Sequence, residues 1–222
     1  ILLNLGQGVA YDNYVGRGVR RNHLEDYREY INGCDIVSFD IYPVVHDKPE
    51  VAGKLEFVPR GVRRLRDWSN GEKIVWNCIE CTHLSNPKVK PTPQQVKAEV
   101  WMSIVHGSQG IVYFCHQFQP RFIEAGLLAD EEMAQTVTAI NREIHSLASV
   151  INQPTLPNAA TVTVRPSDVS ADLAQLLGPR GIAIAVKRHK GMLYLFAVRM
   201  EARPARGAFE LKGLTGDVAI RV

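Results

Sequence analysis

The feature that most constrains the fold of this chain is a fourfold alternation of short apolar segments with amphipathic segments over residues 1–151. Short apolar runs predict buried strands, and apolar residues spaced three and four apart predict helices. The expected strands are Ile1–Leu5, Asp35–Tyr42, Lys73–Ile79 and Gly110–Cys115, and the expected helices are His23–Ile31, Leu55–Trp68, Pro93–His106 and Asp130–Ile151. Apolar strands that alternate with helices predict a parallel sheet covered by helices, and therefore an α/β fold.

Four strand–helix units correspond to half of an eight-unit barrel. They occupy residues 1–153, whereas a complete (β/α)8 TIM barrel typically needs about 250 residues. A stand-alone doubly wound sheet of four units is the structural alternative. The sequence contains neither a G-x-G-x-x-G turn nor a P-loop, so no nucleotide-binding motif supports that alternative.

After Pro154 the pattern changes to alternating apolar and polar residues, which predicts antiparallel strands. The expected strands are Thr161–Arg165, Gly181–Lys187, Met192–Arg199, Ala208–Leu211 and Val218–Val222. We therefore divide the chain into a barrel-like domain, residues 1–153, and a small C-terminal β-sandwich domain, residues 154–222. A module this short buries little core by itself, so we expect it to pack against the first domain.

Composition and charge narrow the classes of partner. The 222-residue chain is 45% apolar and 22% charged with a net charge of +3, which is typical of an ordinary soluble globular protein. Arg60, Arg63 and Arg64 recur at helical spacing, which favours a solvated helix face over a nucleic-acid interface. No apolar run reaches the length of about 18 residues that crossing a membrane requires. We therefore expect no nucleic-acid partner and no membrane partner. The first residue, Ile1, already lies inside an apolar run, which predicts that the sequence begins within a longer protein.

The cysteines and histidines do not form a recognisable metal motif. Cys78-x-x-Cys81 resembles half of a zinc site or a redox pair, but no second C-x-x-C follows and the pair lies across a strand end. Free, buried thiols are therefore the favoured interpretation. His83 and His106 have no partner at ligand spacing, and no H-E-x-x-H motif occurs.

Glu80 ends the apolar run of the third expected strand, and an irregular segment with several prolines follows it. In parallel barrels the chemistry lies at the carboxyl ends of the strands, where catalytic residues come from several strands. A carboxylate at such a position loses solvation unless it has a partner, so its placement there indicates a functional residue. The alternative is a salt-bridged or solvated loop acid.

The two-residue period of a strand predicts which side chains accompany Glu80. One face of the second strand carries Ser38, Asp40 and Tyr42, and one face of the third carries Trp76, Cys78 and Glu80. Because these strands end at the same edge, we expect Asp40, Tyr42 and Glu80 to converge. A tyrosine hydroxyl bonded to a carboxylate keeps that carboxylate ionised and oriented, as a nucleophile requires. A bracing acid and a half-buried strand aromatic are the alternatives for Asp40 and Tyr42.

The end of the fourth strand places aromatic rings beside hydrogen-bonding groups. The candidates for sugar contact are Tyr113, Phe114, His116 and Gln117, together with Gln7 in the loop after the first strand. Sugar recognition uses that combination, because pyranose faces stack on rings while hydroxyl groups need polar partners. Core packing with one solvated histidine is the alternative at the fourth strand, and a surface loop is the alternative for Gln7.

Three segments, Asp35–Pro43, Trp76–Glu80 and Glu99–Phe114, resemble clan A glycoside hydrolases, which are retaining (β/α)8 enzymes of the cellulase and β-galactosidase type. The resemblance covers residues 1–152 and implies strands five to eight of such a barrel, followed by the small β-sandwich that often accompanies it. It implies hydrolysis of β-glycosidic bonds in an oligosaccharide or polysaccharide by a double displacement. It implies no metal and no organic cofactor, because a pair of carboxyl groups carries the chemistry.

The resemblance also implies residue roles. Glu80 falls on the nucleophile and Tyr42 on the tyrosine that contacts it, while Tyr113 or Phe114 replaces the tryptophan usual after strand eight. The substrate-binding candidates are Asp40, Gln7, Trp76, Tyr113, Phe114, His116 and Gln117.

The second catalytic carboxyl group is not assigned within this chain. Retaining hydrolysis needs two carboxyl groups about 5–5.5 Å apart, and the family's acid/base lies on strand four. We therefore expect a missing N-terminal half of the barrel, from the same protein or a second chain, as a partner, and we expect the chain alone to be inactive. The alternatives are a carbohydrate-binding or scaffold protein without catalysis and an inverting hydrolase that uses Asp40 with Glu80.

Overall fold

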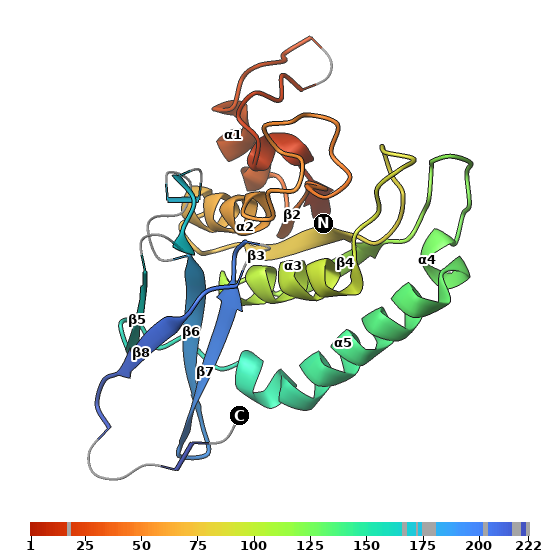
Figure 1. Ribbon diagram of the computed structural model, residues 1–222. Helices are drawn as coiled ribbons and strands as arrows, with labels where there is room; N and C mark the ends of the chain where they lie inside the picture. The colour runs from red at the N-terminus through yellow and green to blue at the C-terminus, as the bar shows by residue number, and fades with distance from the viewer. Residues whose placement is uncertain are drawn as a thin grey trace.

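The protein has a mixed α/β fold built on a four-stranded parallel sheet (Figure 1). The computed structural model describes residues 1–16, 19–165, 168–171, 173–174, 181–201, 204–214 and 219–220. The strands are β1 (Leu2–Asn4), β2 (Ile36–Asp40), β3 (Ile74–Glu80) and β4 (Gly110–Phe114), which lie side by side in chain order. All neighbouring pairs are parallel, so the predicted parallel sheet is confirmed.

Helices follow the strands as the sequence pattern predicts. They are α1 (Asp26–Asn32), α2 (Phe57–Trp68), α3 (Pro93–Val105) and α5 (Glu131–Ile151), with two unpredicted short elements, η1 (Gln7–Val9) and α4 (Gly126–Ala129). A capping box starts α3, because the Thr92 hydroxyl accepts from the Gln95 N–H and the Gln95 side chain accepts from the Thr92 N–H. Among the described residues, no helix combines the length and apolar character that crossing a bilayer requires.

One face of the sheet packs against helices. Val37, Phe39, Val75 and Ile79 on this face are fully buried. The α2 helix lies very close to β2, because a Cβ added at Gly61 would lie 2.1 Å from the Phe39 ring. Tight contact between α2 and the strand therefore depends on a residue without a side chain at position 61.

The opposite face, which we name the open face, is partly accessible to solvent, although Ser38 at its centre is buried. Its residues are Leu2, Asn4, Ile36, Ser38, Asp40, Ile74, Trp76, Cys78, Val112 and Phe114. Leu2, Ile74 and Val112 expose 47%, 41% and 36% of their surfaces. Parallel sheets are usually buried on both faces, so the exposed apolar side chains on this face are unusual for such a sheet.

The C-terminal strands form two small antiparallel sheets. One pairs β5 (Ala160–Val164) with β8 (Gly207–Leu211), and the other pairs β6 (Ile182–His189) with β7 (Met192–Arg199). Figure 1 shows them to the left of α5 and below α2. The fifth expected strand, Val218–Val222, lies for the most part outside the described residues.

These strands pack against the first part of the chain, as predicted. The Trp101 ring on α3 stacks on Phe196 of β7 with ring centroids 5.6 Å apart. Lys187 Nζ donates to the Gln153 carbonyl at 2.7 Å. Val198 and Met200 belong to the same hydrophobic core as residues of α2. The division into two domains after residue 153 stays a prediction, while the core is continuous across it.

Candidate functional site

Glu80 is the last residue of β3, and its side chain has no exposed surface. Its Oε1 accepts a hydrogen bond from the Val44 N–H at 2.7 Å, and its Oε2 accepts one from the Val45 N–H at 3.0 Å. Both donors belong to the segment that follows β2. Two N–H groups aimed at one carboxylate favour its ionised form and fix its orientation.

A second carboxyl group, Glu99 on α3, lies against Glu80. Glu99 is fully buried, and neither of its oxygens receives a hydrogen bond from a donor group in the described part of the chain. Its side-chain hydrogen-bond partner is the Glu80 carboxylate. Two carboxyl groups in contact do not both ionise readily, so Glu99 holds a proton and donates it to Glu80.

The pKa values of both groups rise, and burial is the main cause in each case. Burial raises the pKa of Glu80, while the Val44 and Val45 N–H groups and Glu99 oppose that rise. Burial and then the neighbouring Glu80 charge raise the pKa of Glu99 well above its ordinary value. Glu80 has donors that stabilise its charge and Glu99 has none, so the negative charge resides on Glu80.

The sequence of α3 explains how Glu99 reaches the strand end. Glu99 shares the buried side of the helix with Val96, Val100 and Ser103, which recur at three- and four-residue spacing. One turn further along the helix, the Ser103 hydroxyl accepts from the Asn77 Nδ2 of β3 at 2.8 Å. This bond between the helix and the strand fixes their relative position and brings Glu99 beside the carboxyl end of β3.

The orientation of Glu80 differs from the one that strand periodicity predicts. We expected its side chain on the same face as Trp76 and Cys78, pointing into a cleft. Instead the carboxylate reaches α3 and lies beneath the segment after β2. The physical reason is that Glu80 ends the strand, where two N–H groups and Glu99 offer it hydrogen bonds that the open face does not.

Asp40 lies on the open face within a small polar network. Its Oδ1 accepts from Asn4 Nδ2 at 2.7 Å, and the Ser38 hydroxyl donates to Asn4 Oδ1 at 3.2 Å. Burial, followed by the Asp40 charge, raises the pKa of the neighbouring Cys78 thiol to about 11. The network fixes the orientation of the Asp40 carboxylate through the Asn4 amide.

Tyr42 lies close to the same strand ends and is half-buried. Burial raises the pKa of its hydroxyl above the usual range, and the nearby Asp40, Cys78 and Glu80 add to the rise. Asp40 and Glu80 are both near enough to Tyr42 to raise its pKa, while the convergence of the three side chains on one site stays a prediction. The predicted hydrogen bond is wrong, because both backbone donors to Glu80 belong to Val44 and Val45 and no Tyr42–Glu80 bond occurs among the described residues.

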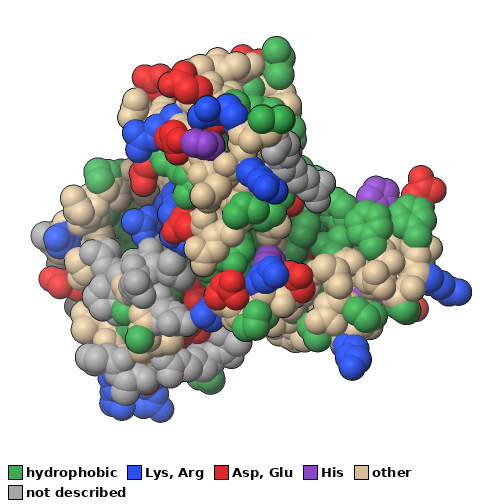
Figure 2. All heavy atoms as spheres, turned by 90° about the horizontal axis from the view of Figure 1, so that it is seen from above, with side chains coloured by type: hydrophobic (Ala, Val, Ile, Leu, Met, Phe, Trp, Pro, Cys, Tyr) green, Lys and Arg blue, Asp and Glu red, His purple; other side chains and the backbone are tan. Residues whose placement is uncertain are grey.

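Aromatic rings extend from Tyr42 outward. Its ring centroid lies 5.5 Å from that of Phe114, which lies 5.6 Å from the His116 ring and 5.9 Å from Phe118. Phe122 stacks on Phe118 at 5.8 Å. Figure 2 shows hydrophobic side chains gathered on the right of the molecule, where the loop after β4 lies in Figure 1.

One sugar-binding prediction at the fourth strand needs correction. The side chain of Tyr113 lies on the helix-covered face, where its hydroxyl donates to Asn141 Oδ1 of α5 at 3.0 Å. Strand alternation places Tyr113 and Phe114 on opposite faces, so only Phe114 belongs to the open face. The Gln117 backbone exchanges two hydrogen bonds with Ile123 at 3.0 and 2.9 Å. Whether the Gln117 side chain touches a ligand stays a prediction.

The remaining candidates lie around the open face. The Trp76 indole covers Gly110 of the next strand, where an added Cβ would lie 2.4 Å from its Nε1. Gln7 Oε1 lies 2.8 Å from His46 Nε2, in the segment that follows β2. Gln7 and Trp76 are therefore held in place by protein contacts. Whether they touch a ligand stays a prediction.

Sequence reasoning missed several residues at this edge. They are Glu99, the N–H groups of Val44 and Val45, and the rings of Phe118 and Phe122. A signal for Glu99 exists, because it is a charged residue on the apolar, core-facing side of α3. The backbone donors leave no comparable signal, since any residue other than proline supplies an N–H.

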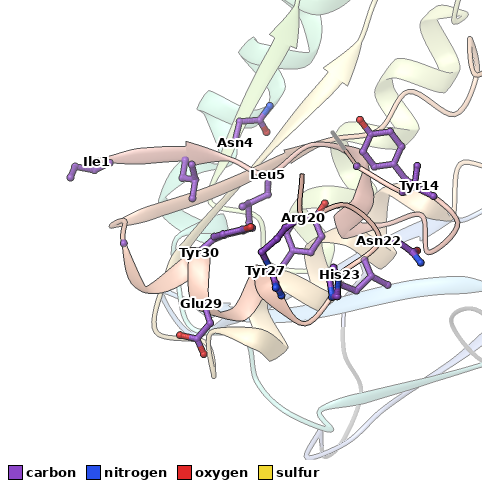
Figure 3. Close-up of a pocket in the computed structure, with 15 residues that line it drawn as sticks. Ile1, Asn4, Leu5, Tyr14, Arg20, Asn22, His23, Tyr27, Glu29 and Tyr30 are labelled. Carbon is purple, nitrogen blue, oxygen red and sulfur yellow. The ribbon is translucent and has the colours of Figure 1, made fainter. Parts of the chain in front are cut away.

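A separate cavity of about 580 Å³ lies beside the edge strand β1. Figure 3 shows it lined by Leu5 and Asn4 of the β1 segment, by Tyr27 and Tyr30 of α1, and by Tyr14. It contains none of the residues that gather around Glu80. The cavity marks an incompletely packed edge of the sheet, and it lies apart from the carboxyl pair.

No metal-binding cluster of three His, Cys, Asp or Glu side chains occurs in the part of the chain that the structure describes. Cys34, Cys78, Cys81 and Cys115 are free thiols. No known family's sequence model matches the chain, and no curated protein matches it either.

Proposed function

We propose that the chain forms one half of a retaining (β/α)8 glycoside hydrolase, with Glu80 as the nucleophile. The observation that carries the proposal is the Glu80 carboxylate at the carboxyl end of a parallel strand, where the Val44 and Val45 N–H groups donate to its two oxygens. Asp40 and Tyr42 lie at the same edge of the sheet. Catalytic groups of parallel barrels occupy this edge.

Barrel completion is supported by the free edges of the sheet. Among the described strands, β1 pairs only with β2, and β4 pairs only with β3. The open face exposes apolar side chains, and unpaired edges and apolar patches favour association. A second half, from the same protein or another chain, would cover that face and supply the acid/base carboxyl about 5–5.5 Å from Glu80.

The proposed chemistry proceeds in two displacements. A Glu80 oxygen attacks the anomeric carbon, the glycosidic C–O bond breaks, and the leaving oxygen takes a proton from the acid of the second half. Water then attacks the anomeric carbon of the glycosyl ester and gives one of its own protons to that carboxylate, which restores the acid and frees Glu80. Before attack, the carboxylate leaves the Val44 and Val45 N–H groups, because it is fully enclosed at rest.

A burst experiment tests the nucleophile without the missing acid. Dinitrophenolate leaves without protonation, so 2,4-dinitrophenyl β-glycosides of glucose, galactose, mannose and xylose isolate the first displacement. We expect a release of dinitrophenolate that approaches one per chain for at least one sugar and is absent in Glu80→Gln. A burst of equal size in Glu80→Gln, or no burst with any of the four sugars, contradicts the assignment.

The second candidate is a carbohydrate-binding protein without catalysis. One observation favours it: the Glu80 side chain has no exposed surface, and backbone groups hold both of its oxygens. Under this alternative, Glu80→Gln binds oligosaccharide as well as the unaltered chain does, and neither protein gives a burst.

A further inference from the structure

We propose that Phe118 and Phe122, in the loop after β4, form an outer sugar-binding subsite, so that the ligand of this protein is an oligosaccharide and not a single sugar. The inference rests on the proposed function and specifies its substrate class. Neither phenylalanine belongs to the sheet, and both lie beyond the residues that gather around Glu80.

The two rings form an exposed, ordered surface. Their planes are 27° apart with centroids 5.8 Å from each other. Phe118 exposes 48% of its surface and Phe122 exposes 61%. Phenyl rings of soluble proteins are usually more buried, and an exposed pair that stacks in a continuous patch indicates a binding surface.

The loop that carries these rings is fixed at both ends. Gln117 and Ile123 exchange two backbone hydrogen bonds and close the loop between them. The Phe118 N–H donates to the His83 carbonyl at 3.0 Å, which ties the loop to the segment after β3. The rings are therefore presented in place before a ligand arrives, which lowers the entropy cost of binding.

His116 supplies a polar group within the same patch. Its Nδ1 lies at hydrogen-bond distance from the Glu124 carbonyl oxygen, which only accepts, so Nδ1 carries the hydrogen. In the neutral ring, Nε2 is then an acceptor. The ring lies 6.1 Å from Phe122 and 6.4 Å from Phe118. An acceptor beside apolar rings suits a ligand that presents both a C–H face and hydroxyl groups, as a pyranose does.

The rings also connect the surface with the sheet. Contacts run from Tyr42 through Phe114 to His116, and from there to Phe118 and Phe122. A sugar over Phe118 and Phe122 therefore lies at some distance from the one near Glu80, and a ligand that fills both positions contains several linked sugars. This geometry predicts an affinity that increases with chain length.

Calorimetric titration with cello-, xylo- and manno-oligosaccharides of one to six sugars tests the subsite in the full chain. In at least one series we expect affinity to rise about tenfold or more from the monosaccharide to the tetrasaccharide, a gain of about 1.4 kcal/mol. The double variant Phe118→Ala/Phe122→Ala should lose that gain. Phe209→Ala removes an exposed ring on β8, away from the loop, and should keep it.

The outcomes separate this inference from the proposed function. Affinity that does not depend on chain length, an unchanged gain in the double variant, or no binding in any series overturns the outer subsite. The dinitrophenolate burst reports on Glu80 independently, because its substrates carry one sugar. A Glu80-dependent burst beside chain-length-independent binding overturns the subsite alone, whereas the absence of both overturns the proposed function as well.

Discussion

At the scale of residues, the carboxyl pair of Glu80 and Glu99 is the most informative feature of the protein. Burial opposes charge on both groups, yet two N–H donors point at one of them. The pair is thus asymmetric: Glu80 holds the charge and Glu99 the proton. The same asymmetry favours the charge on Glu80 over Glu99 and costs stability whenever the proton on Glu99 is lost.

Replacing Glu99 tests this assignment through the pH dependence of stability. The pKa of Glu99 is raised in the folded state, so the folded protein binds a proton that the unfolded chain releases near its ordinary carboxyl pKa. Stability therefore falls as pH rises above that value, by up to about 1.4 kcal/mol per pH unit for one proton. In Glu99→Gln we expect a smaller fall between pH 5 and pH 8 in urea unfolding.

A matched control is Glu132→Gln, which changes an exposed glutamate on α5. We expect that variant to keep the pH dependence of the unaltered chain. If Glu99→Gln and Glu132→Gln show the same slope, the proton is not on Glu99.

At the scale of elements, the sequence pattern predicted the strands and long helices well because each has a local cause. Apolar runs give β2 and β3, and the Thr92 capping box starts α3 where expected. The Glu80–Glu99 contact was not predictable in the same way. It depends on how α3 packs on β3, which long-range contacts such as Asn77–Ser103 determine.

The start of α3 provides a direct test of a local prediction. Thr92→Ala removes the hydroxyl that accepts from the Gln95 N–H. We expect a loss of about 1 kcal/mol in the free energy of unfolding. Thr138→Ala on exposed α5 should change stability little, because alanine is a better helix former. Equal effects of the two substitutions in denaturant titrations would show that the cap contributes nothing.

The contact between α2 and β2 predicts that a glycine-to-alanine substitution in a helix lowers the folding stability, where such a substitution normally raises it. Glycine to alanine in a helix interior normally stabilises by about 0.5–1 kcal/mol. Gly61→Ala should instead destabilise by about 1–3 kcal/mol, because its Cβ would lie 2.1 Å from the buried Phe39 ring. Adding Phe39→Leu should recover part of that loss in a double-mutant cycle. A more stable Gly61→Ala protein contradicts the packing described.

At the scale of the whole molecule, the open face and the free edges determine how the protein behaves in solution. Ile74 and Val112 are exposed on a face that parallel sheets normally bury. We expect the purified chain to associate as its concentration rises, measured by sedimentation velocity. Ile74→Lys/Val112→Lys should weaken that association without a large change in folding stability, since both side chains are already solvent-accessible. A chain that stays monomeric throughout the concentration series contradicts this expectation.

The central claim is that the carboxylate at the end of β3 forms an ester with a sugar, and locating that ester tests the claim most directly. The chain is treated with 2,4-dinitrophenyl 2-deoxy-2-fluoro-β-glycosides, digested with pepsin and analysed by mass spectrometry. We predict one sugar per chain, attached to Glu80, and no adduct in Glu80→Gln. An adduct on Asp40 or another side chain, or an unmodified chain after prolonged treatment, would contradict the account.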